Sequence, residues 1–145
     1  MSIQDEAGLI LRLYELRREA TMRQAREWYF REFHPQSLED FSKELFSEHS
    51  GHLRMVITYW DLAATLVNHG AIGVEVFTDA NTEHIGVFAK IEPILNEMRG
   101  MYAPEFVRNL EKLIDATPNG RKRSAEARER LRAAVARLAA QAQQS

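Results

Sequence analysis

The segment from about residue 51 to residue 68 constrains the fold more than any other part of the sequence. Its apolar residues form two adjacent stripes at helical spacing. These stripes are made by Leu53, Val56, Ile57, Trp60, Ala63, Ala64 and Val67, and by Met55, Tyr59, Leu62 and Leu66. The polar stripe that remains is narrow. A helix that is apolar over most of its circumference belongs in the middle of a bundle, in contact with neighbours on two sides.

The other segments also repeat their apolar residues at helical spacing, and none alternates like a half-buried strand. We therefore predict an all-α fold, a single bundle of about five to seven helices. The first helix should be long, from about Ser2 to Phe33, because Pro35 is the first residue that forces an end. Further helices are expected over about 37–46, 81–99 and 104–115, with a kink at Pro93. The segment 72–77 fits either a helical turn or a short extended piece.

Charge is unevenly distributed, although the formal net charge of the whole chain is only -2. Acidic residues prevail over 34–115 and basic residues over 116–145, and a Thr-Pro-Asn-Gly turn at 117–120 separates the two. We predict a helical bundle domain over 1–117. A basic Ala/Arg-rich helix should follow within 118–145, either docked or partly flexible. Its few large apolar residues, Leu131, Val135 and Leu138, have heptad-like spacing, which fits docking on the bundle, pairing with a second copy or fraying.

Several classes of protein are excluded by what the sequence lacks. The chain has no cysteine, which removes disulfide frameworks, cysteine-based zinc sites and thiol catalysis. It has no glycine-rich nucleotide loop and no Gly-x-Ser-x-Gly motif. The acidic N-terminus and the absence of an apolar run of roughly 18 residues argue against a signal peptide or a membrane span. We expect a cytoplasmic protein.

The five histidines give little support for a metal site. His49 and His52 are close in sequence and lie near Glu44 and Glu48, but Gly51 indicates a helix break between them. A catalytic zinc needs three protein ligands, and a di-iron bundle needs paired Glu-x-x-His motifs. No histidine here has an acid three residues before it. We expect no metal and no cofactor, and a solvated loop between helices at this place.

Asp61 and Arg99 form the candidate polar pair. Asp61 stands amid Tyr59, Trp60 and Leu62, an apolar setting in which a carboxyl group can act as an acid or a base. It also falls on the polar stripe of its helix, so ordinary ion pairing is the alternative. An ion pair between Asp61 and Arg99 would join two distant parts of the bundle.

Aromatic residues and basic residues supply two further candidates. A pocket between helices, opened by the kink at Pro93, would be lined by Trp28, Tyr29, Tyr59, Trp60 and Phe88. At helical spacing such residues more commonly fill the core. A candidate basic patch consists of Arg121, Lys122, Arg123 and Arg128. We do not expect nucleic acid as a partner, because the whole chain is near neutral and carries no helix-turn-helix; docking on the acidic middle of the same or another copy is the favoured use.

Three stretches of the sequence resemble a family of small bacterial all-helical proteins known only as a domain of unknown function. They are residues 56–62, 66–72 and 88–99, and the resemblance extends over about residues 53–100. It would match an aromatic-acid pair to Trp60 and Asp61, a turn to Gly70 and Ile72, and a closing proline and arginine to Pro93 and Arg99. The chain departs from the pattern at Gly73 and by having Asp rather than Glu at Asp61. The resemblance implies a helical fold and no activity.

These observations favour a non-enzymatic helical interaction module over an enzyme. Self-association is expected through the long first helix or the basic last helix, and the partner is expected to be a second copy or another protein. The alternative is a small-molecule-binding protein or an enzyme with a pocket between helices near Asp61 and Arg99.

Overall fold

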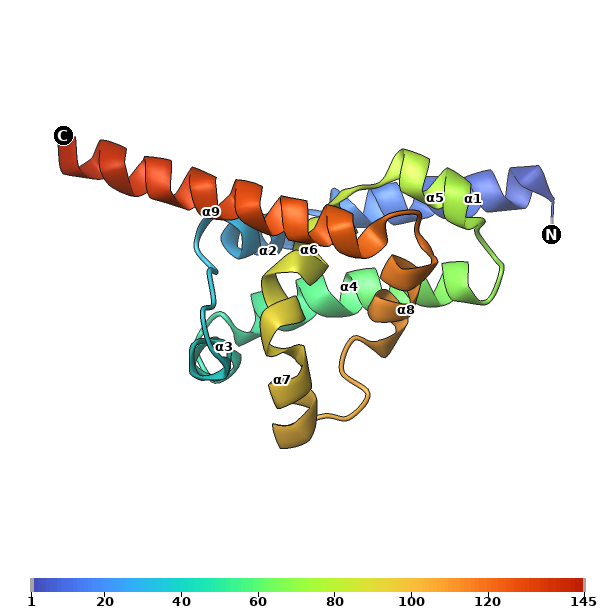
Figure 1. Ribbon diagram of the computed structural model, residues 1–145. Coiled ribbons are helices and arrows are strands. Elements are labelled where there is room, and N and C mark those ends of the chain that lie inside the picture. Colours follow the sequence, from blue (N-terminus) through green and yellow to red (C-terminus); the bar gives the residue numbers. More distant parts are fainter. Residues whose placement is uncertain (1, 145) are drawn as a thin grey trace.

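The computed structural model describes residues 2–144, and within this range the chain is helical without any strand. The predicted all-α class is confirmed, but there are more helices than the five to seven expected. In chain order they are α1 Ile3–Arg17, α2 Ala20–Arg31, α3 Leu38–Leu45, α4 Ser50–Asn68, α5 Val74–Ala80, α6 Glu83–Ile91, the short 3-10 helix η1 Glu92–Ile94, α7 Leu95–Met101, α8 Arg108–Ala116 and α9 Gly120–Gln144 (Figure 1).

Helix α4 is the centre of the fold, as its sequence predicts. It runs across the middle of the molecule and packs against α2, α3, α6 and α8 (Figure 1). Trp60 is only 1% exposed, and Leu53, Ala63 and Ala64 are fully buried. Gly70 ends the helix region in the left-handed conformation, with a φ of 84°, which glycine adopts without steric cost.

The predicted long N-terminal helix is wrong, because the chain leaves the helical conformation at Glu19. This residue has a ψ of 143°, and its carboxylate accepts a hydrogen bond from the backbone N–H of Met22 at 3.1 Å. Glu19 therefore caps α2 and allows α2 to leave the direction of α1. The longest helix is instead the C-terminal α9.

Three expectations about the middle of the chain can be compared with the structure. The segment after Gly73 is helical and forms α5. Pro93 interrupts the helix predicted over 81–99, and the break takes the form of η1 between α6 and α7. Helix α8 begins at Arg108 rather than near Pro104, and the residue before it, Val107, is buried in a left-handed conformation with a φ of 46°.

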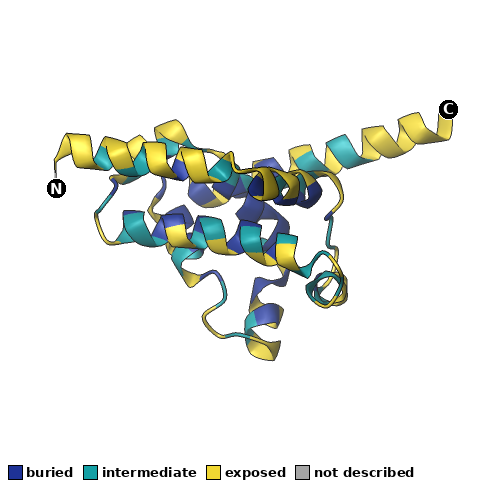
Figure 2. Cartoon of the chain, turned by 180° about the vertical axis from the view of Figure 1, so that it is seen from behind, coloured by how far each residue is buried: buried dark blue, intermediate teal, exposed yellow. Residues whose placement is uncertain are grey.

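Helix α9 lies on the body only along its first half. Gly120, Ser124 and Ala127 are buried, and the helix packs there against α6 and α8. A Cβ atom at Gly120 would lie 1.9 Å from the carbonyl oxygen of Ile114, so only glycine permits this approach. Beyond the body, the second half of α9 projects outward with mostly exposed residues (Figures 1 and 2).

Candidate functional site

Asp61 serves as the cap of α8. One carboxylate oxygen accepts a hydrogen bond from the backbone N–H of Leu110 at 2.8 Å, and the other accepts one from the side-chain amide of Asn109 at 3.1 Å. Leu110 lies in the first turn of α8, where backbone N–H groups have no partner within the helix. Val107, at the N-cap position, supplies no side-chain cap. Asp61 on α4 therefore performs this capping across the interface between the two helices.

Arg99 also binds α8, but through different groups. Its guanidinium pairs with Glu111 at 2.9 Å and donates to the carbonyl oxygen of Phe106 at 3.0 Å. Within the described part of the chain no ion pair joins Arg99 to Asp61, so the direct contact expected between them is not formed. Both side chains hold the start of α8, and this geometry gives neither of them an open site.

The five aromatic residues expected around a pocket belong to the core instead. Trp28, Tyr29, Trp60 and Phe88 are buried, and Tyr59 is half-buried with its hydroxyl donating to the carbonyl oxygen of Leu13. The Tyr29 hydroxyl donates to the carbonyl oxygen of Val87 at 2.8 Å. These contacts satisfy the polar atoms of both tyrosines inside the bundle.

The basic patch is divided between ion pairs and free surface. Arg121 contacts three carboxylates at 2.7–3.0 Å, and Arg128 shares one of them at 3.0 Å. The carboxylates are those of Glu92, Glu111 and Asp115. Lys122 and Arg123 form no ion pair with other described residues. The Arg121 guanidinium holds the pKa of the Asp115 carboxyl below its usual range. These contacts attach the first half of α9 to the acidic middle of its own chain.

Lys90 is a buried cation that the sequence analysis did not select. It is 7% exposed, and its Nζ donates to the carbonyl oxygen of Tyr29 at 2.7 Å and to that of Phe33. The carbonyl of Tyr29 lies in the last turn of α2, where the helix end carries a partial negative charge, and that of Phe33 lies just beyond the helix. Burial lowers the pKa of Lys90 to about 7, whereas its carbonyl partners favour the ammonium form. No carboxylate within residues 2–144 pairs with it.

His34 completes the surroundings of Lys90. The His34 Nδ1 lies 3.2 Å from the Lys90 Nζ, and the His34 Nε2 lies 2.9 Å from the carbonyl oxygen of Arg31. A carbonyl can only accept, so Nε2 carries the proton, and Nδ1 is left to accept from Lys90. Burial, together with the charge of Lys90, lowers the pKa of His34. The histidine is therefore neutral and completes the set of acceptors for the ammonium group.

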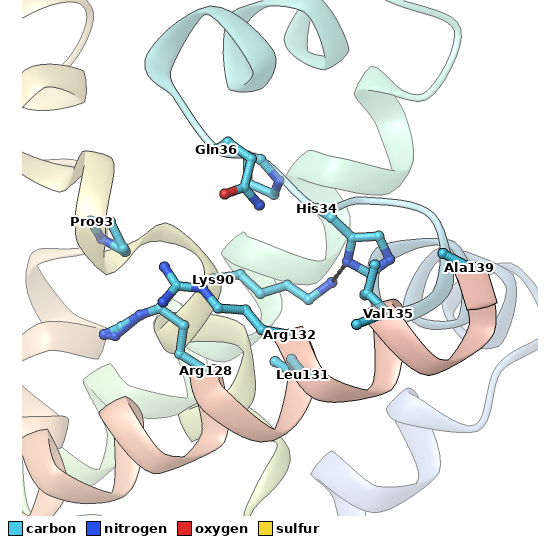
Figure 3. Close-up of a pocket in the computed structure, with 11 residues that line it drawn as sticks. His34, Gln36, Lys90, Pro93, Arg128, Leu131, Arg132, Val135 and Ala139 are labelled. Carbon is cyan, nitrogen blue, oxygen red and sulfur yellow. Dashed lines mark hydrogen bonds between the residues drawn. The ribbon is translucent and has the colours of Figure 1, made fainter.

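A groove lies beside Lys90, between the projecting half of α9 and the turn that follows α2 (Figure 3). Its volume is about 270 Å³. The residues that line it are His34, Pro35, Gln36, Lys90, Pro93, Arg128, Leu131, Arg132, Val135, Ala136 and Ala139. A pocket was expected at the Pro93 kink, and the groove does border this proline, but none of the five predicted aromatic residues lines it.

One sequence signal points to this groove in retrospect. Lys90 stands inside the apolar run Val87–Ile91, where a charged side chain must either leave the core or find polar partners within it. The partners come from α2 and the turn after it, more than fifty residues earlier in the chain. Spacing along α6 therefore reveals the buried charge but not the groove.

In the described range, no group of three or more His, Asp or Glu side chains is arranged so that it could hold a metal ion. His49 stacks on Trp28 at 5.0 Å between ring centroids and its Nδ1 lies 3.1 Å from Glu44. His84 is fully buried against Trp60 and Phe77, and neither of its ring nitrogens finds a hydrogen-bond partner among the residues that the structure describes. Burial, and to a smaller extent Arg123, lowers the pKa of His84 to about 4.

A family model described as a domain of unknown function, DUF4760, matches residues 2–117. The chain belongs to this family. The match confirms the resemblance to a family of unknown function and extends it to α1–α8, stopping shortly before α9. No curated protein and no solved structure matches the chain. Within residues 2–144, no helix combines the length and apolar composition that crossing a bilayer requires.

Proposed function

We propose that this protein is a non-enzymatic helical interaction module that self-associates through the projecting half of α9. The observation that supports this function concerns α9: its apolar face continues beyond the part that packs on α6 and α8. A second copy of the chain is the partner. The proposal also places the protein in the cytoplasm of a bacterium.

The buried face of α9 contains Gly120, Ser124 and Ala127, at the spacing of one helical stripe. The same stripe continues through Leu131, which is half-buried, to Leu138, which is 63% exposed. The first half of the stripe packs on α6 and α8, whereas the second half begins at the groove beside the turn after α2 and continues past it to the exposed Leu138. The heptad-like spacing of Leu131 and Leu138 along this stripe supports pairing with a partner helix.

A second copy fits this face because it presents the same stripe. Antiparallel pairing centred between Ala134 and Val135 would set Leu131 of one copy opposite Leu138 of the other. The alanines that make up much of this half allow two helices to approach closely, and antiparallel alignment opposes the two helix dipoles favourably. Helix α1, with Leu11 and Tyr14 exposed, is the alternative self-association surface proposed from the sequence.

The proposal is tested by the oligomeric state of the full chain. We expect multi-angle light scattering to give a mass that rises from monomer to dimer as protein concentration increases. Leu138→Lys should shift this equilibrium to monomer, because it places a charge in the apolar seam. Ala140→Lys adds the same charge on the opposite face of α9 and should leave the equilibrium unchanged. A wild-type chain that stays monomeric, or equal effects of the two lysines, would contradict the proposal.

The alternative to an interaction module is a small-molecule-binding protein or an enzyme. The region of Asp61 and Arg99 lends it little support, because both side chains are engaged in holding α8. The groove beside Lys90 supports the binding alternative better, since cationic and apolar groups face one concave surface there (Figure 3).

A further inference from the structure

We propose that the groove beside Lys90 binds a small amphipathic carboxylate, with its acid group at the arginine side chains and its apolar tail along α9. This inference rests on Arg128 and Arg132, which lie off the seam used in self-association, although Leu131 borders both the groove and the seam. It therefore does not depend on the proposed function.

The charge of the groove favours an anion. Three cationic side chains, Lys90, Arg128 and Arg132, line it, and no acidic residue does. Their side chains approach the groove from α6 and α9 (Figure 3). Lys90 has no carboxylate partner in the described range, and its three N–H groups are used by the carbonyl oxygens of Tyr29 and Phe33 and by His34. It therefore adds positive potential to the groove rather than a hydrogen bond to the ligand.

Of the two arginines in the groove, Arg132 loses less stabilisation when it exchanges its present ion pair for a ligand. Its ion pair with Glu129 spans 3.2 Å between side chains that are both more than half exposed, and such pairs contribute little to stability. Arg128, in contrast, is mostly buried and shared with Glu92. A planar guanidinium can hold both oxygens of one carboxylate, which makes Arg132 the recognition residue.

The remainder of the lining is apolar and suits a short hydrocarbon tail. It consists of Pro35, Pro93, Leu131, Val135, Ala136 and Ala139. The volume of about 270 Å³ lies slightly below the range of typical ligand pockets and suits a short chain rather than a large cofactor. A polyanion such as nucleic acid would require cations in a row along an open surface, whereas these cations share the groove with an apolar wall.

The groove face and the self-association seam lie side by side on α9 and share Leu131 at their border. Arg128, Arg132 and Ala136 follow one another at intervals of four residues on the groove side. Leu131 and Leu138 lie seven residues apart along the neighbouring stripe. Arg132 and Leu138 can therefore be changed independently.

The test is calorimetric titration of the full chain with octanoate. We expect saturable binding with one site per chain. Octanol, which has the tail without the charge, and acetate, which has the charge without the tail, should not bind at the same concentrations. Equal binding of octanol, or no saturable binding of octanoate, would overturn the inference.

Two arginine variants test whether octanoate binds in the groove. Arg132→Gln should weaken octanoate binding roughly tenfold, as expected on losing a charge-assisted contact. Arg137→Gln removes the same charge from the opposite face of α9 and should leave binding unchanged; equal effects would overturn the assignment to the groove. Leu138→Lys should bind octanoate as the wild-type chain does, which separates failure of this inference from failure of the proposed self-association.

Discussion

The ammonium group of Lys90 donates to the carbonyl oxygen of Tyr29 at 2.7 Å, so a side chain from α6 closes the end of α2. The last carbonyls of a helix have no partner within it, and here a buried cation supplies the missing donor. The same contact attaches α2 to α6 and leaves one side of the lysine facing the groove.

Replacing Lys90 with methionine should therefore destabilise the fold although it removes a buried charge. The carbonyl oxygens of Tyr29 and Phe33 would lose their donor, at a cost of about 1–3 kcal/mol in the free energy of unfolding. Urea denaturation measures this change. Lys112→Met, on the exposed face of α8, is the control and should change the free energy by less than about 0.5 kcal/mol. A Lys90 variant as stable as the control would show that the ammonium contacts contribute nothing net.

Asp61→Ala should destabilise the protein through loss of the cap on α8. The expected cost is about 1–2 kcal/mol, because the first turn of α8 loses two hydrogen bonds to a carboxylate. Asp79→Ala, which removes an exposed carboxylate from α5, is the control. Chemical denaturation followed by circular dichroism compares the two.

A double-mutant cycle tests whether Asp61 and Arg99 act separately. Since the two bind different groups of α8, the effects of Asp61→Ala and Arg99→Ala should add to within about 0.5 kcal/mol. A larger coupling energy would mean that the pair communicates through α8 or meets directly, in contrast to the observed geometry.

Acidification should destabilise the protein through His84. The pKa of His84 is lowered to about 4 in the folded state, so below pH 6.5 the unfolded chain binds a proton that the folded chain does not. The free energy of unfolding should fall by roughly 1.4 kcal/mol per pH unit between about pH 6 and pH 4 and level off below. His84→Leu should remove most of this slope. The exposed His69→Leu should retain it, and equal slopes in both variants would assign the effect to other groups.

Gly120→Ala should loosen α9 from the body. The added Cβ would lie 1.9 Å from the carbonyl oxygen of Ile114, so the helix start must shift by a distance that also disturbs the ion pairs of Arg121. Hydrogen exchange should become faster along the first half of α9. Gly51→Ala, which meets no atom within 4 Å near the start of α4, should stabilise the protein by about 0.5–1 kcal/mol. Unchanged exchange in the Gly120 variant would show that the contact is easily relieved.

The sequence predicts those parts of this fold that depend on local rules. The two apolar stripes of α4 place it at the centre, and Gly70 and Pro93 mark real interruptions. The break at Glu19 was missed because it contains neither glycine nor proline; it depends on a glutamate that caps the following helix. Spacing on a single helix could not show that Asp61 and Arg99 bind α8, since their partners are set by the loop around Val107.

The candidate groove was less predictable than the fold for the same reason. Its walls come from the end of α2, from α6 with η1, and from α9. Only the position of Lys90 in an apolar run signals it in the sequence. The proposed binding groove forms where these three segments converge, which no pattern within one segment can reveal.

The interruption at Pro93 lies where the last helix is attached to the body. It presents the carboxylate of Glu92 to Ser124 and Arg128 on α9, at 2.8 Å and 3.0 Å. The orientation of the projecting half of α9 thus depends on contacts that the first half of the helix makes with another segment of the chain. Substitutions at the exposed tip should therefore leave the attachment of the helix at Glu92 unchanged.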